Sequence, residues 1–360
     1  MFTTEQFFSL SPLCYLPSGK LVFCRLGYFY VFNGDKLEKT FQFPICKTEQ
    51  LFGGIKLLYR LFRFGIRASI AIDENHILLS KGNYLFELDL FSKQLSTGFF
   101  IGTGIRPLIF SVVNGIQGFD DCILFGGYLG NREKKPVHIF KRTSVDKWEI
   151  VYTFEQGAIN HVHNIVADPY RQCLWAFTGD FDEASAIWKI TDNFKKVERV
   201  WGNDQQYRAC VAFPVKDGLL YATDAPFTKN FIYFLNLDTV ELKRIASIDG
   251  SCIYGCQVND KYVFSSAVEP DGRDSSLLKL LTSRQRGAGI KDMYAHLYCG
   301  NLEKGFKEIY KEKKDMWPYL FQFGVFRFPY GNNKTNILYF QPVGTNRNDL
   351  NLLTLDLSEV

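Results

Sequence analysis

The sequence predicts an all-β fold, a seven-bladed β-propeller. A unit of three or four short strands recurs seven times along the 360 residues, at the period of about 40–50 residues that is typical of propeller blades. The 34 Phe and 19 Tyr residues also favour pleated sheet. Two stacked β-sandwiches are the alternative, and the repeat of four strands per unit makes them the weaker prediction.

The units follow one another without a long flexible linker, so we expect a single propeller domain over residues 1–360. The turn at 33–35, Asn-Gly-Asp, is a strong hairpin signal within the first unit. Two insertions interrupt the repeat, near 44–64 and near 270–293, and leucine spacing suggests short helices in both. The predicted strand units cover residues 20–43, 67–101, 108–154, 161–201, 208–248, 253–310 and 324–355.

The last unit contains only three strands, whereas residues 3–10 read as a strand with no unit of its own. An unpaired strand edge is a liability that a closed ring removes. We therefore expect the N-terminal strand, residues 3–10, to complete the last blade and close the propeller.

Composition and motifs give no support to several classes of function. A net charge of +4 does not by itself indicate a nucleic-acid partner, and no apolar window is long enough for a membrane span. The sequence has no P-loop, dinucleotide-binding or nucleophile-elbow motif. Nine scattered cysteines, an odd number, predict free thiols and a soluble, cytoplasmic protein.

Polar residues recur at two places in the units, the start of the first strand and the end of the second. Antiparallel pairing brings these two places to the same end of a sheet, so in a propeller they converge on one mouth. His161 and His163 are two residues apart and should point to the same face. The side chains at these places are Arg67, Arg106, His161, His163, Tyr207, Arg208, Tyr254 and Arg327 at strand starts, and Asp180, Asp224 and Glu269 at strand ends.

Arginine recurs at strand starts in four units, and its forked guanidinium binds carboxylate, sulfate or phosphate. Aromatic side chains beside it suit a sugar ring, so the expected partner is an acidic oligosaccharide or polysaccharide. The expected substrate-binding residues are Arg67, Arg106, Tyr207, Arg208 and Arg327. The expected catalytic residues are His161, His163, Asp180, Asp224, Tyr254 and Glu269.

The run from His161 to Asp180 contains Asp-Pro after one strand and Trp-x-x-Thr-Gly-Asp in the next. In this it resembles sialidase-like, BNR-type β-propeller proteins, some of them associated with bacterial surface polysaccharides, mainly over residues 160–270. The resemblance implies an arginine cluster for a sugar carboxylate and a tyrosine–glutamate pair, here Tyr254 with Glu269. The chain departs from the family in having no Ser-x-Asp-x-Gly-x-Thr-Trp box.

Two function classes remain open. A glycoside hydrolase needs two carboxyl groups, from Asp180, Asp224 and Glu269, whereas a polysaccharide lyase needs a base such as His161 or His163. The alternative is a non-catalytic propeller that binds a glycan or a protein. No cofactor is expected, although His161, His163 and Asp180 could hold a divalent metal.

An enzyme should show a deep pocket that holds His163, Asp180 and Arg208 together, whereas a binding platform should show polar groups paired with one another. If Arg208 clamps a ligand, Arg208→Ala should fold normally and weaken binding by about 2–4 kcal/mol.

Overall fold

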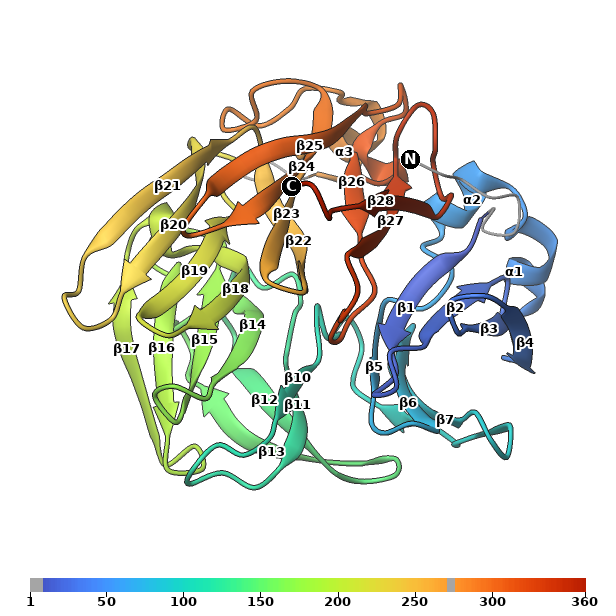
Figure 1. The fold of residues 1–360 in the computed structure, drawn as a ribbon, viewed down its shortest axis with the longest axis horizontal. Helices are drawn as coiled ribbons and strands as arrows, with labels where there is room; N and C mark the ends of the chain where they lie inside the picture. Colours follow the sequence, from blue (N-terminus) through green and yellow to red (C-terminus); the bar gives the residue numbers. More distant parts are fainter. Residues whose placement is uncertain (1–8, 271–275) are drawn as a thin grey trace.

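The computed structural model describes residues 9–270 and 276–360 and has the predicted architecture, a seven-bladed β-propeller. Seven antiparallel sheets stand around one axis, and each sheet is built from consecutive strands of the chain (Figure 1). The first strand of each blade lies nearest the axis, where first strands of neighbouring blades contact one another. Apolar side chains fill the space between adjacent blades, for example between blades three and four.

The blades differ in the number and length of their strands. Blades one to three contain β1 (Ser11–Tyr15), β2 (Leu21–Arg25), β3 (Tyr28–Phe32) and β4 (Leu37–Gln42); β5 (Ala68–Ala71), β6 (His76–Lys81), β7 (Tyr84–Asp89), β8 (Gln94–Leu95) and β9 (Phe99–Phe100); and β10 (Ser111–Val113), β11 (Cys122–Gly126), β12 (Val137–Ser144) and β13 (Lys147–Phe154). Blades four and five contain β14 (His161–Asp168), β15 (Cys173–Gly179), β16 (Ala186–Thr191) and β17 (Lys196–Gly202); and β18 (Ala209–Val215), β19 (Gly218–Thr223), β20 (Asn230–Asn236) and β21 (Leu242–Ile248). Blades six and seven contain β22 (Ser251–Val258), β23 (Lys261–Ala267), β24 (Tyr294–Asn301) and β25 (Gly305–Lys313); and β26 (Val325–Arg327), β27 (Ile337–Val343) and β28 (Leu353–Asp356).

The first blade corrects the prediction that this unit begins at residue 20, because β1 (Ser11–Tyr15) is its inner strand. Proline usually argues against a strand, but Pro12 lies at an irregularity in the pairing of β1 with β2. An inner strand also has one free edge, where a missing N–H is tolerated. The predicted closing strand, residues 3–10, lies almost wholly outside the described residues, which begin at Ser9.

The ring closes between blade one and blade seven, which lie side by side as the blue and red ends of the chain (Figure 1). The Tyr15 amide donates to the Tyr330 carbonyl at 2.8 Å, and the Tyr330 amide donates to the Leu13 carbonyl at 2.9 Å. The buried Gln341 side chain adds two bonds, donating to the carbonyls of Leu10 at 3.0 Å and Leu350 at 2.9 Å.

Gln341→Leu is expected to destabilise the folded chain by about 2–4 kcal/mol, because it leaves two buried carbonyls without a donor. Urea unfolding followed by circular dichroism measures this loss. Gln94→Leu, a change at an exposed position, is the control and should alter the midpoint little. Equal midpoints for the two variants would show that Gln341 does not secure the closure.

Both predicted insertions contain short helices. α1 (Lys47–Phe52) and α2 (Lys56–Leu61) connect blades one and two, and α3 (Leu277–Thr282) lies in the second insertion. α2 and α3 both contact η4 (Tyr319–Phe321), a 3-10 turn before the last blade. No helix in the described part of the chain combines the length and apolarity needed to cross a bilayer.

Candidate functional site

Four inner strands carry one extra residue opposite their second strand, which makes them bulge at corresponding positions. The extra residue is His163 in β14 and Cys210 in β18, and Leu13 and Ile253 occupy the equivalent places in β1 and β22. Bulges re-aim side chains and are common beside active sites. Here they bring His163 and Cys210 into one cluster at the junction of blades four and five.

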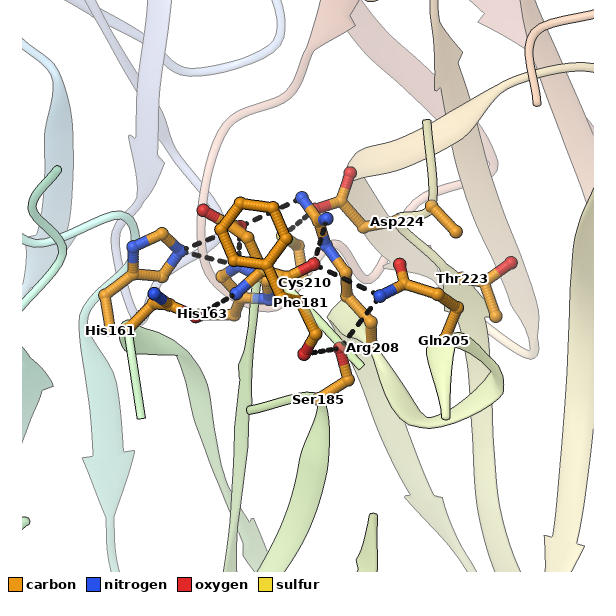
Figure 2. A network of polar contacts seen from close by, with 12 residues as sticks. His161, His163, Phe181, Ser185, Gln205, Arg208, Cys210, Thr223 and Asp224 are labelled. Carbon is orange, nitrogen blue, oxygen red and sulfur yellow. Dashed lines mark hydrogen bonds and ion pairs between the residues drawn. The ribbon is translucent and has the colours of Figure 1, made fainter. Parts of the chain in front are cut away.

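His161 and His163 meet at the start of β14, as their spacing predicted (Figure 2). Their Nε2 atoms lie 2.9 Å apart, and they lie 3.2 Å and 3.4 Å, respectively, from Oδ1 of Asp180. The Nδ1 atom of His161 is 2.8 Å from the Leu129 carbonyl oxygen, which can only accept a hydrogen bond. The proton of a neutral His161 ring therefore resides on Nδ1, and its Nε2 lone pair faces His163 and Asp180.

Arg208 links this pair to the next blade. Its Nη2 atom lies 2.9 Å from Asp180 Oδ1 and 3.3 Å from Asp224 Oδ2, and Nη1 donates to the Asp180 carbonyl at 2.7 Å. Cys210 Sγ donates to the same Asp224 oxygen at 3.4 Å. The side chains of Arg208 and Asp224 are 8% and 6% exposed, whereas that of Asp180 is 33% exposed. The network therefore reaches solvent through Asp180.

Charge pairing decides the protonation of the network. Burial opposes ionisation of Asp180, but His161 and Arg208 outweigh it and hold the pKa of this carboxyl well below its usual range. Burial also opposes the charge of Arg208, yet Asp180 and Asp224 raise its pKa above the ordinary value. Burial lowers the pKa of His163, and the neighbouring His161 lowers it further. At neutral pH His163 is thus neutral beside a stable ion pair.

Two phenylalanines lie beside the network. Phe181 follows Asp180 directly and lies beside the network (Figure 2). It stacks on Phe227, with ring centroids 6.2 Å apart, and the Arg208 guanidinium lies 5.8 Å from the centroid of Phe227. Gln205 donates to the Asp180 carbonyl at 3.1 Å. These contacts hold Arg208 and Asp180 in place.

A cavity of about 130 Å³ lies next to this network. Tyr128 belongs to its wall, and its ring packs at a tilt against the His161 ring, with centroids 4.3 Å apart. Tyr254 and Glu269 also line the cavity. Four further lining residues are arginines that reach it from different elements: Arg63, Arg67, Arg106 and Arg327.

Among the described residues, these four arginines have no carboxylate within ion-pair distance. Four other arginines do form ion pairs there, for example Arg60 with Asp315 at 2.6 Å. Burial and then the neighbouring Arg106 lower the pKa of Arg67 to about 10. The pKa of Arg63 is lowered for the same reasons. The cavity is therefore a concentrated site of positive charge.

Arg106 is the most firmly held of the four. Its backbone exchanges two hydrogen bonds with Tyr128, at 3.1 Å and 2.9 Å, and its guanidinium lies 5.0 Å from the Tyr128 ring centroid. Arg327 in β26 has a buried Nε atom without a hydrogen-bond partner. Both groups are thus available to an anion in the cavity.

Glu269 is the acidic group of the cavity. Burial and the nearby Asp224 raise the pKa of this carboxyl to about 8, and its Oε2 atom is buried without a hydrogen-bond partner. At neutral pH Glu269 is therefore mostly protonated and can donate a hydrogen bond or a proton into the cavity.

The structure divides the predicted site residues between two adjacent groups. One group lines the cavity and consists of Arg67, Arg106, Tyr254, Glu269 and Arg327. The other group forms the network beside it and consists of His161, His163, Asp180, Arg208 and Asp224. Tyr207 belongs to neither group. Tyr207 ends the 3-10 turn η2 (Gln205–Tyr207) and packs against the core between blades four and five. This placement corrects its expected role in the mouth: its ring is used in apolar packing rather than in the cavity.

Arg208 also differs from its expected role as a ligand clamp. It is buried, and its Nη1 and Nη2 atoms contact Asp180 and Asp224, whereas its Nε atom is a buried donor without a hydrogen-bond partner. His161 and His163 lie behind the Tyr128 ring and do not line the cavity. Sequence reasoning missed Arg63, which belongs to the helical insertion, and no strand-based alignment would place it in the mouth.

The residues that carry the sialidase-like resemblance have structural roles. Asp168 accepts hydrogen bonds from the Tyr170 and Arg171 amides and from the Trp175 indole, which fixes the turn between β14 and β15. Thr178 donates to the Ala184 carbonyl at 2.7 Å. These contacts place Asp168 and Thr178 in the turn and loop packing of blade four.

No family model matches the sequence, and no curated protein matches it. Among solved structures, the AfRom2 CNH domain is similar with a TM-score of 0.52 and 8% identity over 98% of this chain and 96% of that chain. A chain of the mitotic checkpoint complex reaches 0.51 with 12% identity over 99% and 93%. The extracellular domain of the putative one component system BT4673 from B. thetaiotaomicron reaches 0.51 with 10% identity over 98% of this chain and 39% of that chain. At such identities the similarity shows a common propeller fold and nothing about the ligand.

Proposed function

We propose that the protein binds the acidic group of a glycan in the central cavity, with Arg63, Arg67, Arg106 and Arg327 as its cationic receptors. The observation that carries this proposal is the convergence of four guanidinium groups that pair with no carboxylate in the described part of the chain. Like charges repel one another, so this arrangement costs stability unless an anion completes it. Guanidinium forks match carboxylates and sulfates in geometry as well as in charge.

The cavity wall favours a sugar over a simple inorganic anion. Tyr128 and Tyr254 offer aromatic faces, and the protonated Glu269 offers a hydrogen-bond donor for a hydroxyl or carboxylate. The volume of about 130 Å³ is below the roughly 300–1,000 Å³ of pockets for larger ligands. The ligand is therefore one acidic sugar unit, such as a uronate or sialic acid, at the end of a chain.

Hydrolysis of that glycan is a second candidate function, and the state of Glu269 favours it. A carboxyl that retains its proton at neutral pH beside the ligand can act as a general acid on the glycosidic oxygen. The elimination alternative is less favoured, because its bases, His161 and His163, lie behind Tyr128.

Calorimetric titration with matched oligosaccharides tests the proposal. Oligosaccharides that end in a uronate or sialic acid should bind, their reduced, carboxyl-free counterparts should not, and added salt should weaken the binding. Equal binding of charged and neutral forms would refute the proposal. If the wild-type protein releases the terminal sugar, and the Glu269→Gln variant binds the oligosaccharide but no longer releases that sugar, the protein is a hydrolase.

Binding should also weaken as pH rises through about 8. Glu269 is neutral below this pH and becomes an anion facing the ligand above it, so affinity should fall about tenfold between pH 7 and 9. The pKa of Glu269 in the folded state, about 8, lies above the ordinary value of about 4.3 that applies to the unfolded chain. The free energy of unfolding should therefore fall as pH rises from about 4.3 to about 8. Glu269→Gln should flatten both profiles; an unchanged decline in the variant would assign it to another group.

A further inference from the structure

The geometry at the start of β14 points to a second site, distinct from the arginine cavity. We propose that His161, His163 and Asp180 bind one divalent transition-metal ion of the zinc class through the two Nε2 atoms and one carboxylate oxygen. This inference goes beyond the proposed glycan binding and does not depend on it.

The spacing of the three atoms fits such an ion. They are separated by 2.9 Å, 3.2 Å and 3.4 Å. A tetrahedral ion with ligands at about 2.0–2.1 Å requires its ligands to lie roughly 3.3 Å apart. Two imidazoles and one carboxylate are ligands of zinc and of iron(II), whereas magnesium and calcium prefer oxygen alone. The three protein ligands would leave at least one coordination position for water or a substrate oxygen.

The surroundings orient the histidines as metal ligands. The hydrogen bond from His161 Nδ1 to the Leu129 carbonyl directs the Nε2 lone pair inward, which is the usual outer contact of a metal-binding histidine. His163 Nδ1 and Asp224 Oδ1 are buried atoms without hydrogen-bond partners, and both residues belong to one cluster with Cys210. A His163 bound through Nε2 would carry its proton on Nδ1, which is the buried atom without a partner in the described residues.

Access and charge favour this cluster over the neighbouring one. His163, Cys210 and Asp224 also lie close enough to hold an ion, but all three are buried, and Cys210 Sγ donates to Asp224. Asp180 is 33% exposed and gives the proposed site a route from solvent. The ion would compete with Arg208 for Asp180 Oδ1, while Arg208 keeps its contacts with the Asp180 carbonyl and with Asp224.

Tyr128 connects the two sites physically, since it stacks on His161 and forms part of the cavity wall. The arginines of the cavity are not ligands of the ion. Arg67→Met should therefore leave metal binding intact, which separates this inference from the proposed function.

The test is a titration of the chelator-treated, full-length protein with Co²⁺, followed by its visible absorption, and then displacement by Zn²⁺. We expect one ion per chain and no competition from Mg²⁺. Loss of an outer partner of a metal ligand typically costs about 10–100-fold in affinity, so His161→Ala and His163→Ala should each cost at least about 100-fold. His138→Ala is the matched control, because His138 contacts Thr153 and belongs to none of the groups of described residues that lie close enough to hold an ion.

Two further measurements test the proposed metal site even if the His163→Ala variant does not fold. In the wild-type protein, bound Co²⁺ should broaden the ring-proton NMR signals of His161 and His163 but not those of His296. Cys210→Ser should bind Co²⁺ as the wild type does. Absence of saturable binding, unchanged affinity in His161→Ala, or loss of binding in Cys210→Ser would overturn the proposed ligand set.

Discussion

Replacing Arg67 and Arg327 together by methionine is expected to abolish binding of an acidic oligosaccharide and to stabilise the folded chain. The guanidiniums repel one another in the cavity, so fewer charges there should raise stability by about 0.5–2 kcal/mol. Each lost charge-assisted contact should weaken binding by about 2–4 kcal/mol. Urea unfolding and calorimetric titration of the same preparations measure the two effects.

Arg142→Met is the matched control for this double variant. Arg142 is paired with Glu87, with Nε 2.8 Å from the carboxylate, and it does not line the cavity. Its loss should lower stability and leave ligand binding unchanged. If the double variant is instead less stable than the wild type, the four arginines are not an uncompensated cluster.

Arg208→Met is expected to destabilise the protein by about 3–5 kcal/mol, because it leaves the Asp180 and Asp224 carboxylates without their shared cation in a buried setting. The sequence alone predicted that Arg208→Ala folds normally, whereas the ion pairs with Asp180 and Asp224 predict a loss of stability. Urea denaturation of the variant measures the effect.

A compensated variant provides the control for Arg208. Arg208→Met combined with Asp180→Asn and Asp224→Asn removes the unpaired charges and should recover part of the lost stability. The Asp180 carbonyl, which accepts from Arg208 Nη1 at 2.7 Å, would still lack this donor, so full recovery is not expected. If Arg208→Met retains normal stability and loses only glycan binding, Arg208 is a ligand clamp after all.

The two expected results follow from one difference between arginines that look alike in the sequence. Arg208 has two carboxylate partners, and its removal leaves their charges unpaired. Arg67 and Arg327 have no such partner within residues 9–270 and 276–360 and repel their neighbours. The first arrangement is typical of a structural ion pair. The second is retained at a cost in stability, which is the pattern of a binding site.

Much of the fold could be predicted from the sequence, because strand period and turn chemistry are local. The hairpin at Asn33 is an example: the Asn33 side chain accepts from the Asp35 and Lys36 amides, as the Asn-Gly-Asp run predicted. The meeting of His161, His163 and Asp180 also followed from a local rule, since an antiparallel hairpin returns the chain to the same end.

Only the tertiary structure decided how the charges are shared, because pairing depends on distances between blades rather than on position within a blade. It assigned Arg208 to Asp180 and Asp224, placed Arg63 from the helical insertion in the cavity, and put Tyr128 between the cavity and His161. Strand starts and strand ends, read from the sequence by itself, identified five residues that line the cavity, Arg67, Arg106, Tyr254, Glu269 and Arg327, but not Arg63. Packing across neighbouring blades determined which of them remain unpaired for a ligand.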